Sequence, residues 1–251
     1  MYQYIYDNFL SAKKYDKTLA RIEAKLIDLG IKGKTHKLTV LKNFESYLKE
    51  IADKNLDSLV VVGDDTTIIK VLNIIVEKEI VLGIIPIGEK NMVADFFGIP
   101  KNIDACDILA ARKIEEVDLG KVGGQFFLSS VEAYGEGVSI LCNNQYEIKT
   151  LANTEKIGFY NLCFKGESDR IFNPQDGQLE IISNHKESKG LFKKTKQNLI
   201  KTVLKVKKAK ILSSEKSNSV LVDGQKIIKT PVEVEVADKK LKVIVGKRRK
   251  F

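Results

Sequence analysis

The sequence has few of the residues that carry thiol and imidazole chemistry, and it has no tryptophan. Its 251 residues include three cysteines and two histidines. Cys106, Cys142 and Cys163 are odd in number and none stands in a C-x-x-C pair. This disfavours a disulfide framework, thiol redox chemistry and a thiolate metal site, and it fits a reducing cytoplasm. His36 and His185 lie in no recognisable triad or zinc-binding pattern, and we expect both on the surface or in loops.

Long hydrophobic runs are also absent. The longest, residues 59–63 and 82–87, fall far short of the roughly 18 apolar residues that a membrane-spanning helix needs. The opening residues MYQYIYD contain neither a basic segment nor an apolar one, so they do not resemble a secretory signal. We therefore expect a cytoplasmic globular protein, and we exclude an integral membrane protein, a collagen and a secreted disulfide scaffold.

The positive charge is concentrated in two places. The formal net charge is +9, the segment from Lys186 to Lys210 holds ten lysines against Glu187, and residues 247–250 are all basic. Localised charge attracts anions such as lipid headgroups, nucleic acid or phosphate. The Lys186–Lys210 segment is thus a candidate for peripheral contact with an anionic membrane; alternatively, its lysines only solvate an exposed loop and strand edge. No zinc finger, RNA-binding aromatic pair or basic recognition helix accompanies them, so no nucleic-acid partner is expected.

The first part of the chain alternates apolar strands with helices. The hydrophobic pattern predicts strands over residues 2–6, 37–41, 59–62 and 81–86, and helices over residues 16–29, 43–52, 66–78, 91–97 and 104–111. Continuous apolar strands that alternate with helices are typical of a parallel sheet covered on both faces. Residues 1–115 are therefore predicted to form a Rossmann-like α/β lobe.

The pattern changes after Asp118. Predicted strands follow one another with Gly, Asn and Asp between them, over residues 126–134, 146–150, 157–164, 179–183, 203–213, 219–222, 232–236 and 241–245. The sequence VEVEV at 232–236 alternates strictly, as a half-buried antiparallel strand does. We therefore expect an α/β protein of two lobes, with an antiparallel β-sandwich over residues 116–251.

Two strand-to-helix turns in the first lobe are candidates for ligand binding. They lie at residues 62–67 (VGDDTT) and 86–91 (PIGEKN). In open α/β sheets, ligands gather at the carboxyl ends of the strands, where the free amides at helix N-termini can hold phosphate.

Motifs in order along the chain resemble the diacylglycerol kinase catalytic-domain family, within the lipid kinase and NAD kinase superfamily. The family has a Pro-Leu-Gly-Thr-Gly-Asn turn followed by a short helix, and this chain has similar residues at 82–88, Asn91, Ala94 and the GIP at 98–100. The family's Gly-Gly-Asp-Gly-Thr turn corresponds to residues 62–66. Further matches are residues 117–122 with 126–128, the DGQL at 176–179, the VDGQ at 222–225, and residues 232–245 as its last β-hairpin.

The resemblance implies ATP- and Mg²⁺-dependent phosphorylation of a lipid hydroxyl in a cleft between the lobes, and it allows a homodimer. The residues that it matches to nucleotide contacts are Gly63, Asp64, Thr66, Gly88 and Asn91. Asp223 would belong to the catalytic side, Gln225 stands at the position of the general base, and Asp176 lies in a structural Mg²⁺ loop.

The chain departs from the family pattern at several of these positions. Val62 and Asp65 replace glycines of the first turn, and Glu89 with Lys90 replaces Thr-Gly in the second. Gln225 replaces the glutamate base, and an amide cannot accept a proton at neutral pH. The first hypothesis is a lipid kinase, and the second is a non-catalytic, pseudokinase-like protein that uses the same fold to bind a ligand or partner.

In the kinase hypothesis, other residues of this chain take over the roles of the replaced family residues. Asp64 and Asp65 together could hold Mg²⁺, Lys90 could bind phosphate as a point charge, and Asp223 could take over as base. NAD kinase is a third reading, but that family carries an Asn-Glu pair on its substrate side, and no such dipeptide occurs in this sequence.

Overall fold

The computed structural model divides the chain into two compact units. The first comprises Met1–Val117 with Lys239–Phe251, and the second is Asp118–Asp238. The structure describes residues 2–38, 44–52, 56–142, 145–150, 154–162, 164, 172–186, 199–214 and 217–251.

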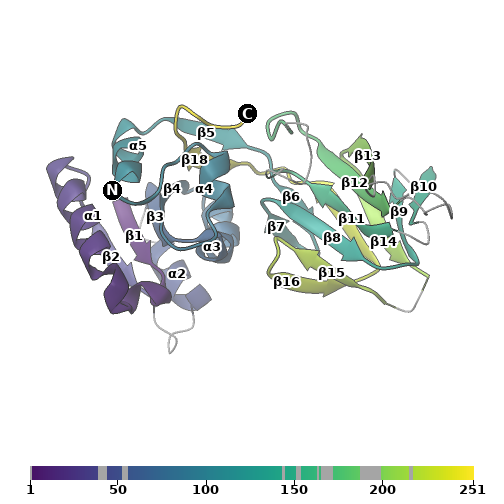
Figure 1. Cartoon of the computed structure of the whole chain (residues 1–251), viewed down its shortest axis with the longest axis horizontal. Coiled ribbons are helices and arrows are strands. Elements are labelled where there is room, and N and C mark those ends of the chain that lie inside the picture. The colour runs from purple at the N-terminus through teal and green to yellow at the C-terminus, as the bar shows by residue number, and fades with distance from the viewer. Residues whose placement is uncertain are drawn as a thin grey trace, which may run out of the picture. The chain divides into compact units, whose positions relative to one another are not determined.

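The first unit is built on a six-stranded sheet with the order β2–β1–β3–β4–β18–β5 (Figure 1). Its strands are β1 (Tyr2–Tyr6), β2 (Lys34–Lys37), β3 (Ser58–Gly63), β4 (Val81–Pro86), β5 (Ile114–Val117) and β18 (Leu241–Ile244). Neighbouring strands run parallel, except that β5 is antiparallel to β18. Every residue of β3 and β4 is buried, as the continuous apolar runs predict for central strands of a covered sheet.

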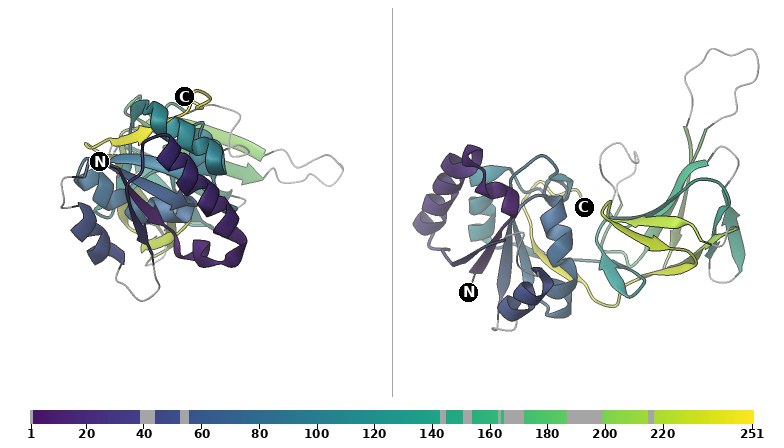
Figure 2. Two further views of the ribbon diagram at one scale, coloured as in Figure 1. Left: turned by 90° about the vertical axis from the view of Figure 1, so that its left-hand side faces the viewer. Right: turned by 90° about the horizontal axis from the view of Figure 1, so that it is seen from below.

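Helices cover both faces of this sheet (Figures 1 and 2). They are α1 (Asp16–Asp28), α2 (Phe44–Ala52), α3 (Asp65–Glu77), α4 (Met92–Phe96) and α5 (Ala105–Ala111), with short 3₁₀ turns η1 (Asn8–Ser11), η2 (Lys13–Tyr15) and η3 (Asn102–Asp104). α1 packs with α5, and α3 packs with α2 and α4. No helix of the described residues is long and apolar enough to cross a membrane.

The second unit is a sandwich of two antiparallel sheets. Their strand orders are β10–β9–β14–β17–β6–β7 and β13–β12–β11–β8–β15–β16. The strands are β6 (Gly120–Val122), β7 (Gln125–Phe127), β8 (Ser130–Tyr134), β9 (Val138–Cys142), β10 (Tyr146–Lys149), β11 (Thr154–Tyr160), β12 (Leu179–Lys186), β13 (Leu199–Val206), β14 (Lys208–Ser213), β15 (Ser219–Val222), β16 (Lys226–Lys229) and β17 (Val232–Val236). Side chains from both sheets form an apolar core that includes the fully buried Phe127, Phe159 and Ile211. The two-lobe α/β and β-sandwich fold class is confirmed.

The C-terminal segment returns to the first unit, which differs from the expected lobe of residues 116–251. β18 lies between β4 and β5, so residues 232–245 do not form a hairpin: β17 and β18 belong to different sheets. The last residues then dock beside α4. Gly98, at φ +70°, leaves no room for a Cβ, which would lie 2.4 Å from the Arg249 nitrogen, and the Phe251 ring stacks on Phe96.

Two predicted long strands are each broken in the structure. The stretch 126–134 divides into β7 and β8, and the stretch 203–213 divides into β13 and β14, with the two parts of each in different sheets. Strand-like residues continue through both breaks, so hydrophobic pattern alone does not reveal where the chain changes sheet.

The structure also corrects the expectation for His36. This residue is buried on β2, where its ring nitrogens lie 2.7 Å from the Tyr47 hydroxyl and 2.7 Å from the Gln3 side-chain oxygen. Cys106 and Cys142 are buried free thiols, whereas Cys163 and the side chain of His185 lie outside the described residues.

The position of β18 gives a test of the unit boundary. Leu241 is fully buried and pairs with Val117 of β5. We expect Leu241→Ala to lower the free energy of unfolding by about 2–5 kcal/mol, because it leaves a cavity in the sheet's core. Lys247→Ala, at an exposed position, is the control and should stay within about 0.5 kcal/mol. Urea denaturation followed by circular dichroism measures both; equal stability of the two variants would contradict this role of β18.

Candidate functional site

The turn from β3 into α3 is held by Asp64. Its carboxylate oxygen Oδ1 accepts the backbone amides of Thr66 (3.0 Å) and Thr67 (3.4 Å), which makes Asp64 the N-cap of α3. A Cβ at Gly63 would lie 2.8 Å from the Thr67 hydroxyl oxygen, so only glycine fits there. The Thr67 hydroxyl donates to the carboxylate of Asp7, and this contact ties the end of β1 to the same turn.

Asp65 points to the other turn. Its Oδ2 accepts the Met92 amide at 2.8 Å and its Oδ1 the Val93 amide at 3.1 Å, while its own amide donates to the Lys90 carbonyl at 2.9 Å. Burial raises the pKa of the Asp65 carboxyl to about 6, against the opposing effect of the two amide donors. The sequence suggested that this carboxylate could hold Mg²⁺ together with Asp64. In the structure, both of its oxygens accept amides at the start of α4.

The turn from β4 into α4 has a glycine with positive φ and a buried side-chain amide. Gly88 has φ +104°, and the Asn91 side-chain nitrogen donates to the Gly88 carbonyl at 2.8 Å. Asn91 is buried, and its oxygen Oδ1 has no hydrogen-bond partner among the described residues. Glu89 and Lys90 are exposed. The Asn91 oxygen is therefore unpartnered in the described part of the chain but buried, whereas the Lys90 ammonium is on an exposed side chain that an anionic ligand can reach.

A shallow pocket of about 280 Å³ adjoins this turn. It is lined by Lys14, Tyr15, Thr18, Ile87, Gly88, Glu89 and Asn102. Lys14 and Tyr15 belong to η2, which the sequence analysis did not single out because a short 3₁₀ turn has no periodic signature. This pocket and the two turns form the candidate ligand site of the first unit.

The first unit therefore brings its predicted site residues together. Gly63, Asp64, Asp65 and Thr66 lie against Gly88, Lys90 and Asn91 through the contacts of Asp65 and an approach of the Asp64 side chain to Gly88. Helix N-termini attract anions because of their free amides and dipole. Here the amides of Thr66, Thr67, Met92 and Val93 already bond to the carboxylates of the chain itself.

Asp223 lies in the second unit, at the β15–β16 hairpin. Its backbone has φ +47° and Gly224 has φ +66°, and the Gln225 amide donates to the Val222 carbonyl at 3.0 Å. Positive φ at both central residues defines the tight hairpin turn that favours Asp-Gly. The turn alone therefore accounts for this dipeptide, and it leaves the Gln225 side chain exposed.

The Asp223 carboxylate is fully occupied. It accepts the amides of Leu128 (2.9 Å), Ser129 (2.7 Å) and Ser130 (3.0 Å), and the Ser129 hydroxyl at 2.6 Å. Burial raises the pKa of Asp223, and these donors act in the opposite direction. The carboxylate holds the connection between β7 and β8, the place where the predicted long strand breaks.

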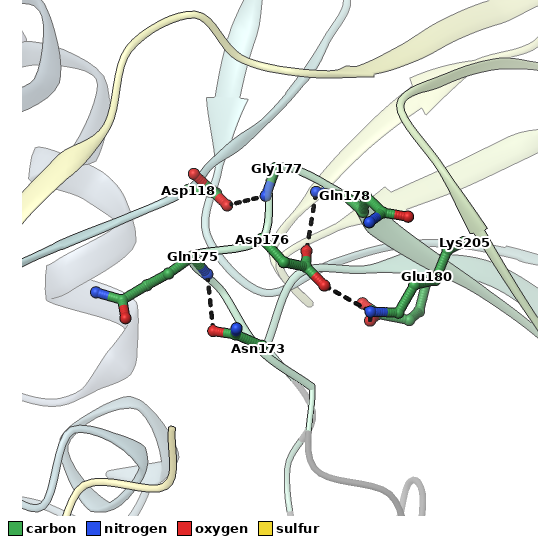
Figure 3. Close-up of polar contacts among 8 residues, drawn as sticks. All are labelled: Asp118, Asn173, Gln175, Asp176, Gly177, Gln178, Glu180 and Lys205. Atoms are coloured by element: carbon green, nitrogen blue, oxygen red, sulfur yellow. Dashed lines mark hydrogen bonds and ion pairs between the residues drawn. The ribbon is translucent and has the colours of Figure 1, made fainter.

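Asp176 lies in the loop that leads into β12 (Figure 3). One carboxylate oxygen accepts the Gln178 amide at 3.0 Å, and the other contacts the Lys205 ammonium at 2.5 Å. The described residues contain no group of three or more His, Cys, Asp or Glu side chains placed to hold a metal ion. The donor set around Asp176 therefore does not fit Mg²⁺, because an ammonium group takes the place that a cation would need.

Comparison with known proteins finds a family model and several relatives that resemble this chain. Residues 4–122 match the model of the "Diacylglycerol kinase catalytic domain". The chain is 30% identical over 129 residues to a diacylglycerol kinase of Bacillus subtilis (strain 168). The aligned stretch covers 50% of this chain and 43% of that protein. It is 27% identical over 128 residues to a diacylglycerol kinase of Staphylococcus saprophyticus. This aligned stretch covers 50% of this chain and 42% of that protein.

These two matches span less than half the length of the relatives. A crystal structure of a diacylglycerol kinase from Bacillus anthracis str. Sterne superposes with a TM-score of 0.78 at 22% identity, over 98% of this chain and 97% of that one. The structural likeness extends the shared fold to both units.

The contacts of Asp223 predict a structural role that can be measured. We expect Asp223→Asn to lower the free energy of unfolding by at least about 1.5–3 kcal/mol, because one oxygen is replaced by an amide that faces backbone donors. Gln225→Ala, two residues away and exposed, should change stability by less than about 0.5 kcal/mol. Urea denaturation measures both, and an Asp223→Asn protein as stable as the unmodified chain would refute the structural role.

Proposed function

The chain belongs to the diacylglycerol kinase catalytic-domain family, which residues 4–122 match, and from that premise we propose that it acts by binding a ligand without appreciable phosphoryl transfer. The observation that carries this proposal is the position of the Asp65 carboxylate on the amides of Met92 and Val93. An incoming phosphate would have to displace this carboxylate and would meet the negative charge of Asp64 beside it.

The second unit supports the same proposal. A general base needs a free lone pair within hydrogen-bond reach of the hydroxyl that it deprotonates. Gln225 cannot supply one, because a side-chain amide does not accept a proton at neutral pH. Asp223 has its carboxylate committed to four donors. Loss of the general base typically removes a factor of about 10²–10⁴ in rate.

ATP- and Mg²⁺-dependent phosphorylation of a lipid hydroxyl is the second candidate function. It is favoured by the unpartnered Oδ1 of Asn91 and by the exposed Lys90. In this reading Gly63 and Gly88 allow close approach of the nucleotide, Lys90 binds a phosphate, and Asp64 is the candidate Mg²⁺ ligand. Mg²⁺ would neutralise charge on the phosphates.

A partner surface is proposed from the charge distribution. Of the lysines between Lys186 and Lys210, Lys205, Lys208 and Lys210 are paired with carboxylates. Four more lysines lie between residues 187 and 198 against Glu187, outside the described residues. We assign peripheral contact with anionic lipid, at the cytoplasmic face of a membrane, to this latter segment.

Nucleotide binding separates the two candidate functions. We expect millimolar ATP with Mg²⁺ to leave the melting temperature of the unmodified protein unchanged. Asp65→Gly should gain a Mg·ATP-dependent increase, because it frees the amides of α4; a ligand at 100 times its Kd stabilises the native state by about 2.7 kcal/mol. Asp16→Gly, which removes an acidic residue from the first turn of α1, is the matched control and should show no response.

The same proteins are assayed for transfer of radiolabelled phosphate from ATP to diacylglycerol in mixed micelles. No transfer by the unmodified chain is expected. Transfer above the background of a boiled sample, together with a Mg·ATP-dependent thermal shift, would replace the binding proposal by the kinase candidate.

Vesicle binding tests the proposed membrane contact. Each lysine near an anionic surface contributes about 1 kcal/mol, so replacing Lys193, Lys194 and Lys196 together by Gln should weaken binding to phosphatidylserine vesicles by about 100-fold. The control replaces Lys13, Lys17 and Lys32, which are exposed in the first unit, with the same change in net charge. Sedimentation with vesicles measures both, and equal losses in the two triple variants would remove the segment 187–198 from the contact.

A further inference from the structure

A nearly buried carboxylate in the second unit lies beside a lysine from the neighbouring strand. Glu180 of β12 and Lys205 of β13 are directly opposite in the strand register. The Lys205 ammonium is 3.7 Å from Glu180 Oε1 and 2.5 Å from Asp176 Oδ2. Figure 3 shows the ammonium between the carboxylates that the loop and the strand present. One ammonium group thus faces two carboxyl groups.

The Glu180 side chain depends on this cation. It is only 3% exposed, and its Oε1 has no hydrogen-bond partner among the described residues. Burial of an ionised carboxylate is costly unless an opposite charge compensates it. Burial raises the pKa of Glu180 to about 7, and the charge of Lys205 acts in the opposite direction by favouring the ionised form. The Lys205 side chain is half exposed at 49%, so its stem reaches inward while water can solvate the remaining face of the ammonium.

The loop before β12 is arranged around the same charges. The Gly177 amide donates to Asp118 Oδ2 at 2.7 Å, the Gln178 amide donates to Asp176 Oδ1 at 3.0 Å, and the Gln175 amide donates to the Asn173 side chain at 3.1 Å. These bonds fix Asp176 so that its second oxygen faces Lys205.

We infer that the Lys205 ammonium is a built-in structural cation, which takes the place of a divalent metal ion at Asp176 and Glu180. The donor chemistry supports this assignment, because carboxylate oxygens are the ligands that Mg²⁺ and Ca²⁺ use. A covalently attached cation makes the fold of this loop independent of dissolved metal ions. The inference concerns stability and does not depend on whether the chain transfers phosphate.

Removal of the ammonium should expose a latent metal site. Lys205→Met keeps the length and the apolar stem of the side chain but leaves Asp176 and Glu180 as two carboxylates without their counter-cation. Ca²⁺, which accepts six to eight oxygen ligands in flexible geometry with water completing the shell, fits such a partial site better than Mg²⁺.

The experiment compares melting temperatures with and without millimolar Ca²⁺ or Mg²⁺, at constant ionic strength. The unmodified protein should not respond. Lys205→Met should melt at least about 2–4 °C lower and should regain most of this loss in Ca²⁺. Lys205→Arg, which keeps a cation, should not respond to either ion.

Lys208→Met is the matched control. The Lys208 ammonium lies 2.6 Å from Glu233 and 3.0 Å from Glu235, and its side chain is 51% exposed. The substitution therefore also removes a lysine charge that is shared by two carboxylates, but neither of these carboxylates is buried. Its melting temperature should not respond to Ca²⁺. Adding Asp176→Asn to Lys205→Met should abolish the Ca²⁺ response.

Two results would overturn the inference. One is stabilisation of the unmodified protein by Mg²⁺ or Ca²⁺ that Asp176→Asn removes, since a metal ion would then already occupy the loop. The other is a Lys205→Met protein that neither ion stabilises. If Lys205→Met is unfolded without divalent ions, recovery of its circular dichroism signal in Ca²⁺ supports the inference, and failure to recover in either ion counts against it.

Discussion

The hydrogen bonds that the amides of Met92 and Val93 donate to the Asp65 carboxylate join the two strand-to-helix turns of the first unit. The Asp65 amide also donates to the Lys90 carbonyl, so both the side chain and the backbone of one residue fix the second turn. Asp64 meanwhile caps its own helix. Capping by a carboxylate satisfies donors that would otherwise be open to water or to an anion. Under the proposed function, the arrangement that stabilises these turns also opposes the binding of phosphate.

In the second unit, too, carboxylates accept hydrogen bonds from groups of the chain itself. Asp223 is saturated by three amides and a hydroxyl, and Asp176 is shared between an amide and the Lys205 ammonium. These are positions at which a resemblance to a kinase family assigns a catalytic or metal-binding role. In this chain each carboxylate has protein donors instead, and a buried carboxylate with a full set of donors gains little from an external ligand. The proposed function accordingly gives Asp176 and Asp223 structural roles in this chain.

Much of the fold follows from the sequence. The continuous apolar runs of β3 and β4 and the helical spacing in α1 are local signals, and the structure agrees with both of them. The sheet changes between β7 and β8 and between β13 and β14 were not predictable, because the residues keep a strand-like pattern through the break. The first of these breaks is fixed by Asp223, which lies more than 90 residues away along the chain.

The sequence by itself determined the fold class, the alternation of strands and helices in the first unit, the residue types at the two strand-to-helix turns and the glutamine at the position of the base. Only the tertiary structure decided where the carboxylates point and that the last strand returns to the first sheet. The physical reason is that helix and strand periodicity depends on neighbours a few residues apart. The partner of a carboxylate or of an inserted strand is instead supplied by a distant segment that only folding brings within hydrogen-bond distance.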